Sequence, residues 1–266
     1  MFTQIEVEKY FDDKLHIAYL NQPDTFNSLN QVLLQELREF VIQCNDDENV
    51  RCIAISGRGK AFCSGQNLKE ALMIGMQSND EKIIQKIVVE LYNPLVREIS
   101  ESPKPVISLV NGPAVGAGAM LALICDFTLA TENSYFSQAF TNIGLIPDTG
   151  GTYFLPKLLG RQQASYLAFT GKKISAQEAK SMGFIADVFP DDEFTLKSME
   201  VLEQISNAPT TAIGLTKSAF NLSYENTIVQ QLELEGIYQQ QAAETSDFKE
   251  GVQAFLEKRK PNYTGR

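Results

Sequence analysis

Alternating strand-like and helix-like hydrophobic patterns run through the first part of the chain. Residues 5–10 and 15–20 predict two strands joined by a polar turn. Residues 28–46 place apolar side chains at spacings of three and four, which is the period of an amphipathic helix. A continuously apolar stretch at 50–57 then predicts a buried strand. Such alternation is typical of an α/β fold.

The pattern continues with a long amphipathic helix at 80–100 and a second buried strand at 106–110. The elements expected after them are strands at 121–130, 134–136 and 185–190, and helices at 150–159, 162–171, 175–183 and 192–206. From 210 to 266 the pattern predicts helices that are polar on one face. We therefore expect an α/β core at 1–200 and a helical region at 201–266.

Length and composition are those of an ordinary globular protein. The chain has 266 residues, of which 44% are hydrophobic and 21% charged. A chain of this size buries roughly 70–75% of its unfolded surface, so its core needs no disulfides or structural metals. No basic and apolar leader opens the sequence, and no apolar run reaches about 18 residues. We expect a cytoplasmic protein that does not enter a membrane.

The net charge of the chain limits which classes of ligand we expect it to bind. The formal net charge is 23 − 33 = −10, which gives no support for nucleic acid or an anionic membrane surface as a ligand. Any site for a polyanionic ligand must therefore gather its positive groups locally.

Cysteine and histidine give little sign of metal or nucleophile chemistry. Cys44, Cys52, Cys63 and Cys125 are far apart and form no CxxC pair, so we interpret them as reduced thiols. His16 is the only histidine and lies inside a predicted strand, where a structural role is favoured over a catalytic triad or a metal site. We expect no metal.

Two glycine-containing segments follow predicted strands, at 59–68 and 111–120. Both could direct free backbone N–H groups at a ligand, and the second opens a helix whose dipole favours an anion. The spacing of Gly112, Gly116 and Gly118 does not fit the dinucleotide pattern G-x-G-x-x-G. Close helix–sheet packing is the alternative explanation for these glycines.

These segments and several others resemble the crotonase (enoyl-CoA hydratase/isomerase) superfamily. The resemblance extends nearly from end to end and is carried by residues 27–29, 61–68, 111–120, 144–152, 169–179 and 255–261. It implies a spiral of ββα turns that forms an acyl-CoA-binding core, followed by C-terminal helices that build a homotrimer or homohexamer. Coenzyme A would arrive as part of the substrate, with no prosthetic group.

The resemblance also assigns the binding residues. Two backbone N–H groups, those of Gln66 and Ala117, would form an oxyanion hole for the thioester carbonyl. The coenzyme A pocket would lie near Lys60, Ala61, Phe62 and Leu68. Because the chain is acidic, the phosphates of coenzyme A need local cations, and Lys258 and Arg259, from the same or a neighbouring subunit, are candidates. The alternative is that these two charges are simply solvated.

The positions of the proton-transfer residues favour isomerisation over hydration. Family hydratases hold a water between two glutamates, and the corresponding positions here are Met120 and Phe140. Neither side chain can move a proton, so both are expected to line the acyl pocket instead.

Asp148 is the carboxylate that remains in this neighbourhood. An aspartate here faces the acyl chain in isomerases of the superfamily. Apolar neighbours would raise its pKa and make it a base able to shuttle one proton between two carbons. The alternative is that Asp148 caps the following helix.

The subgroup that the chain most resembles is the epoxyphenylacetyl-CoA isomerases of aromatic degradation, which also convert 3-enoyl-CoA to 2-enoyl-CoA. The alternatives are an enoyl-CoA hydratase of fatty-acid β-oxidation and a non-catalytic or RNA-binding protein with the same fold. A dehalogenase would need a tryptophan and a nearby histidine, and the chain has no Trp. The acyl group stays undefined, because the residues expected to line its pocket, in 68–76 and in the C-terminal helices, match no family motif that identifies it.

Overall fold

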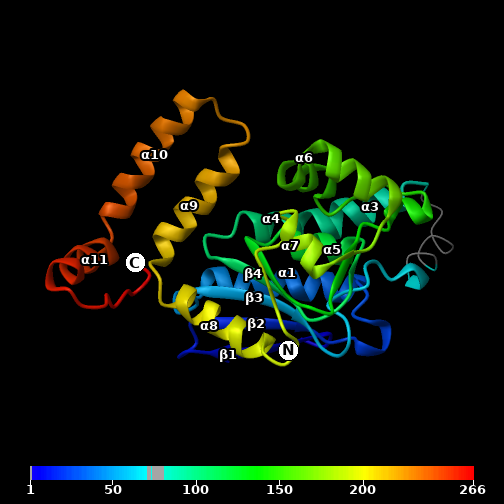
Figure 1. Cartoon of the computed structure of the whole chain (residues 1–266), viewed down its shortest axis with the longest axis horizontal. Coiled ribbons are helices and arrows are strands. Elements are labelled where there is room, and N and C mark those ends of the chain that lie inside the picture. Colours follow the sequence, from blue (N-terminus) through cyan, green and yellow to red (C-terminus); the bar gives the residue numbers. More distant parts are fainter. Residues whose placement is uncertain (1, 71–72, 74–80) are drawn as a thin grey trace.

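A six-stranded sheet forms the centre of the molecule (Figure 1). The computed structural model describes residues 2–70, 73 and 81–266. The strands of this sheet, in spatial order, are β1 (Ile5–Tyr10), β2 (Leu15–Leu20), β3 (Cys52–Gly57), β4 (Val106–Val110), β6 (Phe127–Thr131) and β9 (Asp187–Phe189). β1 pairs antiparallel with β2, and every later pairing is parallel.

A second, three-stranded sheet consists of β5 (Ala114–Val115), β7 (Tyr135–Ser137) and β8 (Ile174–Ser175). β5 and β7 are parallel, while β7 and β8 are antiparallel. β4 leads into β5 and then α5 (Ala117–Leu123), and β6 leads into β7 before α6 (Gly151–Thr170). These two successive units have the predicted ββα arrangement.

Both faces of the large sheet are buried, and the alternation along β3 shows how. Ile53 and Ile55 belong to the core on one face, whereas Cys52 and Ala54 belong to the core on the other. The helices that pack around the sheets are α1 (Gln31–Asp46), α4 (Asn93–Ser100), α5 (Ala117–Leu123), α6 (Gly151–Thr170), α7 (Ala176–Ser181) and α8 (Phe194–Ser206). Two buried faces explain why β3 and β4 are continuously apolar in the sequence.

A π-helical turn interrupts the helix that leads into α4. α3 (Ile83–Ile87) is followed by the π turn Val88–Tyr92, in which the N–H of Asn93 reaches the carbonyl of Val88. Pro94 supplies a physical reason, because its ring would clash with the carbonyl four residues earlier in a regular α-helix. The predicted helix at 80–100 is confirmed from residue 83; Asp80 lies outside the described residues.

The last three helices form an arm beside the core (Figure 1). They are α9 (Thr210–Leu222), α10 (Ile228–Ala243) and α11 (Ser246–Glu257). α9 is tied to the core by Lys217, whose Nζ lies 3.0 Å from Asp126 Oδ2, and by Asn221, which donates to the carbonyl of Ser100 at 2.8 Å. The expected domain boundary after residue 200 falls inside α8, which packs on the sheet through Leu202.

Two predicted elements differ from the structure. The strand expected at 121–130 is wrong for 121–126, because residues 121–123 form the end of α5 and β6 begins only at Phe127. Every residue of α5 is buried, so this segment has no polar face from which a helical period could be detected. Helix was expected as far as residue 266, but the chain after α11 is not helical. Its Thr264 and Gly265 N–H groups donate to the Asp247 carboxylate instead, at 2.6 and 2.8 Å.

The predicted helices at 150–159 and 162–171 correspond to the two parts of α6, which Gly160 separates with φ 69° and ψ 158°. Within the described residues, none of the helices combines the length and apolarity needed to span a bilayer.

The ion pair between Lys217 and Asp126 gives a test of how the arm is attached. Lys217→Met should lower the free energy of unfolding by about 1–3 kcal/mol, because it removes the charged hydrogen bonds of a buried ammonium and leaves the partly exposed Asp126 carboxylate without its cation. Urea unfolding at fixed protein concentration measures this. The double variant Lys217→Met/Asp126→Asn should recover much of the loss. A change within about 0.5 kcal/mol, as at an ordinary surface position, would contradict the structural role.

Candidate active site

A cavity of about 300 Å³ lies where the two glycine-containing segments meet the π turn. The residues that line it are Ser64, Gly65, Gln66, Leu68, Ile84, Ile87, Val88, Tyr92, Val115, Gly116, Ala117, Ala139, Phe140, Asn142, Ile143, Leu145 and Asp148. The structure thus brings together Gln66, Ala117, Leu68, Phe140 and Asp148, all of which the sequence analysis selected.

The backbone of Gln66 is oriented by a parallel bridge to Leu29. The Leu29 N–H donates to the Gly65 carbonyl at 2.7 Å, and the Asn67 N–H donates to the Leu29 carbonyl at 2.8 Å. Because alternate peptide groups of an extended segment point to opposite sides, the N–H of Gln66 points away from Leu29. It is therefore available on the side of the cavity that Gln66 lines.

Ala117 is the first residue of α5, where N–H groups have no acceptor within the helix. The two turns lie very close. A Cβ at Gly65, which has φ 91°, would lie 2.7 Å from the Val115 carbonyl oxygen and 3.6 Å from Ala117 N. Glycine is thus required at residue 65, and the two N–H groups face one cavity. Such a pair of donors suits a developing oxyanion.

The alternative explanation for the glycines, close packing, also holds at particular positions. A Cβ at Gly118 would lie 2.3 Å from the Cys63 carbonyl oxygen, and one at Gly112 would lie 2.4 Å from that of Lys60. Close packing and the placement of the N–H donors therefore have the same cause, because the two backbones can approach only where a side chain is missing.

Asp148 is half-buried at the edge of this cavity, just before α6. Burial raises the pKa of its carboxyl, and the hydrogen bond from Thr149 Oγ1 to Oδ1 at 2.8 Å opposes part of that rise. The N-cap of α6 is Gly150, and within the described structure no side chain caps this helix. The alternative of Asp148 as a helix cap is therefore wrong.

The apolar surroundings of Asp148 agree only in part with expectation. Phe140, Ile143 and Leu145 line the cavity, but Ile146 is 74% exposed. Met120 was expected in the acyl pocket, and this is wrong: it is completely buried. Its sulfur would lie 3.5 Å from a Cβ at Gly151, so Met120 packs beneath the start of α6.

The expected coenzyme A residues divide into three groups. Leu68 lines the cavity and Lys60 is exposed, as a ligand contact requires. The side chains of Ala61 and Phe62 are 1% and 0% exposed, so any contact that they make with coenzyme A would be through their backbone, and their place near the coenzyme A pocket stays a prediction. Phe62 belongs to the hydrophobic core and lies next to Cys63, which bridges Ala114.

Lys258 and Arg259 are absent from the cavity's described lining. They follow α11 at the end of the arm, far from α5 (Figure 1). Arg259 pairs instead with Glu250 and Glu257, each at 2.6 Å. That they supply positive charge to the phosphates of coenzyme A, from the same or a neighbouring subunit, stays a prediction.

Two residues of the site were missed by the sequence analysis. Asn27 is completely buried, and its Nδ2 donates to the carbonyls of Arg58 and Ala61 at 2.9 and 2.8 Å, which shapes the turn before Gln66. Tyr92 is 2% exposed, lines the cavity and donates its hydroxyl hydrogen to Gln66 Oε1. Pro94, two residues later, was the available signal that the helix changes register there.

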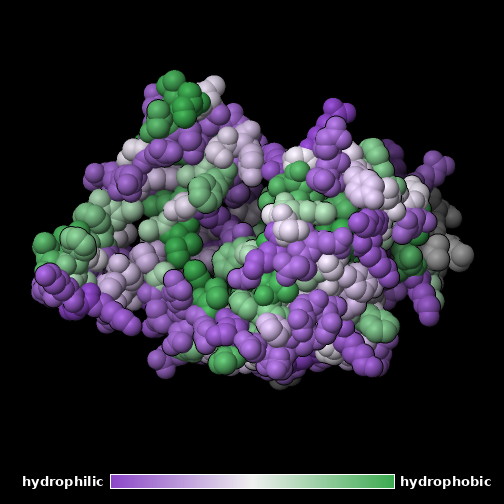
Figure 2. All heavy atoms as spheres, viewed as in Figure 1, coloured by the Kyte–Doolittle hydropathy of each residue, from purple (hydrophilic) through white to green (hydrophobic). Residues whose placement is uncertain are grey.

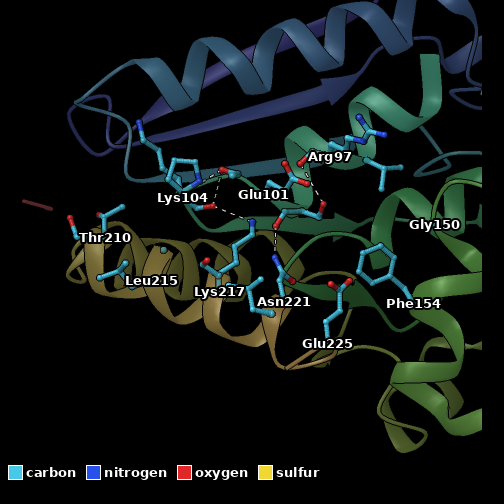
Figure 3. Close-up of a pocket in the computed structure, with 18 of the residues that line it drawn as sticks. Arg97, Glu101, Lys104, Gly150, Phe154, Thr210, Leu215, Lys217, Asn221 and Glu225 are labelled. Carbon is cyan, nitrogen blue, oxygen red and sulfur yellow. Dashed lines mark hydrogen bonds between the residues drawn. The ribbon is translucent and has the colours of Figure 1, made fainter. Parts of the chain in front are cut away.

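A larger cavity of about 970 Å³ lies between α4, the start of α6 and α9 (Figure 3). Lys217 reaches into it and donates to the carbonyl of Ile99 at 2.8 Å as well as to Asp126. Gly150 and Phe154 form its boundary near Asp148. Because Lys217 is committed to protein acceptors, its role is to dock α9.

No group of three or more His, Cys, Asp or Glu side chains in the described part of the chain could hold a metal ion. All four cysteines are buried and free of disulfides. Burial raises the pKa of Cys44 and of Cys63 to about 12, so neither is a reactive thiolate.

The enoyl-CoA hydratase/isomerase family profile matches residues 13–266. The chain belongs to this family. It is 40% identical to a 1,2-epoxyphenylacetyl-CoA isomerase of Escherichia coli strain K12 over 247 residues, which cover 93% of this chain and 94% of the relative. It is 38% identical to a probable enoyl-CoA hydratase of Rhodobacter capsulatus, covering 95% of each.

Solved structures agree with the family. The crystal structure of an enoyl-CoA hydratase from Bacillus anthracis superposes with a TM-score of 0.92 at 34% identity, covering 99% of this chain and 100% of that one. The predicted superfamily and its fold are thereby confirmed. An epoxyphenylacetyl-CoA isomerase is among the relatives, as the subgroup resemblance predicted.

The raised pKa of Asp148 gives a test by stability. The folded protein favours the protonated carboxyl, so the contribution of Asp148 to stability is greatest below the ordinary aspartate pKa and declines as pH rises through the raised pKa. Asp148→Asn, neutral at every pH, should therefore melt at a higher temperature than the wild type at neutral pH, with a gap that narrows as pH falls.

Thermal unfolding from about pH 8 down to the ordinary pKa of aspartate, about 4, measures this gap. Asp192→Asn, at an exposed position, is the matched control and should show little change at any pH. A lower melting temperature for Asp148→Asn at neutral pH would contradict the inference that the carboxylate is desolvated.

Proposed function

We propose that this protein binds acyl-CoA thioesters and moves a double bond from C3 to C2, with Asp148 carrying the proton. The observation behind this proposal is that Asp148 is the one carboxylate among the described lining residues of the smaller cavity. Its raised pKa brings it nearer to the range in which a carboxylate is an effective base. 1,2-Epoxyphenylacetyl-CoA, named for the E. coli relative, is a further candidate substrate.

The reaction needs no oxidant or external acid. The Asp148 carboxylate removes a proton from C2, and the electrons of that C–H bond move into the thioester carbonyl. The resulting enolate oxygen accepts hydrogen bonds from the N–H groups of Gln66 and Ala117, each worth about 3–4 kcal/mol in comparable sites. Asp148 then returns the proton to C4, and the double bond lies between C2 and C3.

The apolar side chains that line the cavity would limit exchange of this proton with solvent. Phe140, Ile143 and Leu145 line the cavity together with Asp148, and a bound acyl chain packed against them would displace water from beside the carboxylate. Exclusion of water strengthens each hydrogen bond to the enolate and suppresses loss of the proton to solvent. Coenzyme A is delivered as part of the substrate, and we expect the protein to act in the cytoplasm without a prosthetic group.

Hydration is the second candidate, because relatives and structural neighbours carry hydratase names. Two residues of this chain argue against hydration. Met120 and Phe140 occupy the positions at which the superfamily resemblance expects two glutamates, and Met120 is completely buried. A water molecule therefore has no pair of carboxylates to hold and activate it.

We also propose that the arm builds a homotrimer or homohexamer. Large apolar side chains are exposed along α10 and α11: Ile228, Val229, Leu232, Ile237, Phe248, Val252, Phe255 and Leu256. Figure 2 shows apolar surface near the start of α10, at the top of the view, and around α11, at the left. Large apolar patches exposed on a protein surface are typical of protein–protein interaction sites.

Asp148→Asn should lower kcat for 3-enoyl-CoA isomerisation by about 10²–10⁴-fold, the usual contribution of general acid–base catalysis. Thioester binding should survive, because the proposed oxyanion donors are backbone groups. Steady-state kinetics with Asp192→Asn as control measures both. The wild type should hydrate crotonyl-CoA poorly or not at all, and hydration faster than isomerisation would refute the single-carboxylate mechanism.

Light scattering should give a trimer or hexamer mass at micromolar concentration, because association buries the apolar face of α10. Leu232→Glu should weaken assembly by placing a charge in that interface, whereas Gln230→Glu on the same helix is the control for an added charge. A wild-type monomer at this concentration would rule out the proposed assembly.

A further inference from the structure

The π turn before α4 has a consequence for the cavity. A π turn adds one residue to a helical turn, which rotates the side chains that precede Pro94 relative to a regular helix. Val88 and Tyr92, at its two ends, both line the cavity. The π turn therefore directs Tyr92 toward the site, although the apolar period of the sequence alone does not place Tyr92 on that face.

Tyr92 contacts the Gln66 side chain from the wall of this cavity. Its hydroxyl donates to Gln66 Oε1, while Gln66 Nε2 donates weakly to the Asn67 carbonyl at 3.4 Å. Only 2% of Tyr92 is exposed, so the hydroxyl lies in a wall that is otherwise largely apolar. A buried hydroxyl costs stability unless it is hydrogen-bonded, and Gln66 supplies that partner.

Gln66 is thus held from two sides. The bridge to Leu29 fixes its backbone from outside the cavity, through the bonds at Gly65 and Asn67. Tyr92 fixes its side chain at the cavity wall. Without the hydroxyl, the Gln66 side chain would be free to change rotamer, and the peptide that carries the N–H would lose one of its two restraints.

We propose that Tyr92 is a positioning residue, whose hydrogen bond to the Gln66 side chain keeps the Gln66 N–H directed at the thioester oxygen. This inference rests on the proposed oxyanion hole and adds Tyr92 as a residue on which the geometry of that hole depends. Phenylalanine would fill the same wall with equal apolar surface, so packing alone does not account for the hydroxyl.

The protonation state of Tyr92 agrees with this role. Burial, with a further contribution from the charge of Asp148, raises the pKa of the phenol well above its usual value. The hydroxyl therefore stays a hydrogen-bond donor throughout the pH range in which the protein would work, and it does not compete with Asp148 for the substrate proton.

The test uses acetoacetyl-CoA, whose bound enolate has its own ultraviolet absorbance and reports the oxyanion hole directly. The wild type should bind this probe largely as the enolate. Tyr92→Phe should lower the enolate-to-keto ratio of the bound probe by about 10- to 100-fold, the cost of displacing a positioned group by about 1 Å or less. In turnover, kcat should fall by a similar factor while KM changes little.

Gln66→Ala supplies the second variant, since it removes the side chain but keeps the backbone N–H. It should reproduce the loss seen with Tyr92→Phe, and the double variant should lose no more than either single one. Tyr10→Phe is the matched control, because the Tyr10 hydroxyl donates to Glu8 on a strand away from the cavity. It should leave the enolate ratio unchanged.

The outcomes separate this inference from the proposal on which it rests. An unchanged enolate ratio in Tyr92→Phe, with a wild type that enolises the probe, would overturn the role of Tyr92 and leave the oxyanion hole standing. Additive losses in the double variant would also overturn it. A wild type that binds acetoacetyl-CoA only as the keto form would overturn the oxyanion hole, and the role of Tyr92 with it.

Discussion

The site depends on the close approach of two backbone turns, which the parallel bridge between Cys63 and Ala114 holds together. Gly65 and Gly118 allow this approach, because a Cβ at either would meet a backbone oxygen at 2.7 or 2.3 Å. The approach leaves the N–H groups of Gln66 and Ala117 facing one cavity. Donors fixed in this way need no reorganisation when charge develops on a substrate oxygen.

Rigidity around this pair comes from separate parts of the chain. Leu29 orients the Gln66 backbone, Asn27 shapes the turn before it, and Tyr92 holds its side chain. Asp148, by contrast, lies before a helix that it does not cap, in a turn where Thr149 has φ 52°. Its burial disfavours the charged carboxylate. Such a local loss of stability is typical of groups retained for chemistry.

The sequence identified the backbone segments that line the cavity better than the side chains of the pocket. Gln66 and Ala117 follow from strand-to-turn junctions, which a motif records residue by residue. Met120 was misplaced, because a motif position does not say whether a side chain faces the cavity or the core beneath α6. Tyr92 was missed, because its direction depends on a single-residue change of helical register near Pro94.

The sequence by itself determined the family, the α/β alternation and the candidate acid–base residue, since these depend on local periodicity and on motifs with fixed spacing. The tertiary structure decided which of these residues share a cavity. It joined Gln66, Tyr92 and Asp148, and it left Arg259 paired with Glu250 at the end of the arm. Contacts between distant segments arise only when the sheets and helices pack, so no local pattern in the chain encodes them.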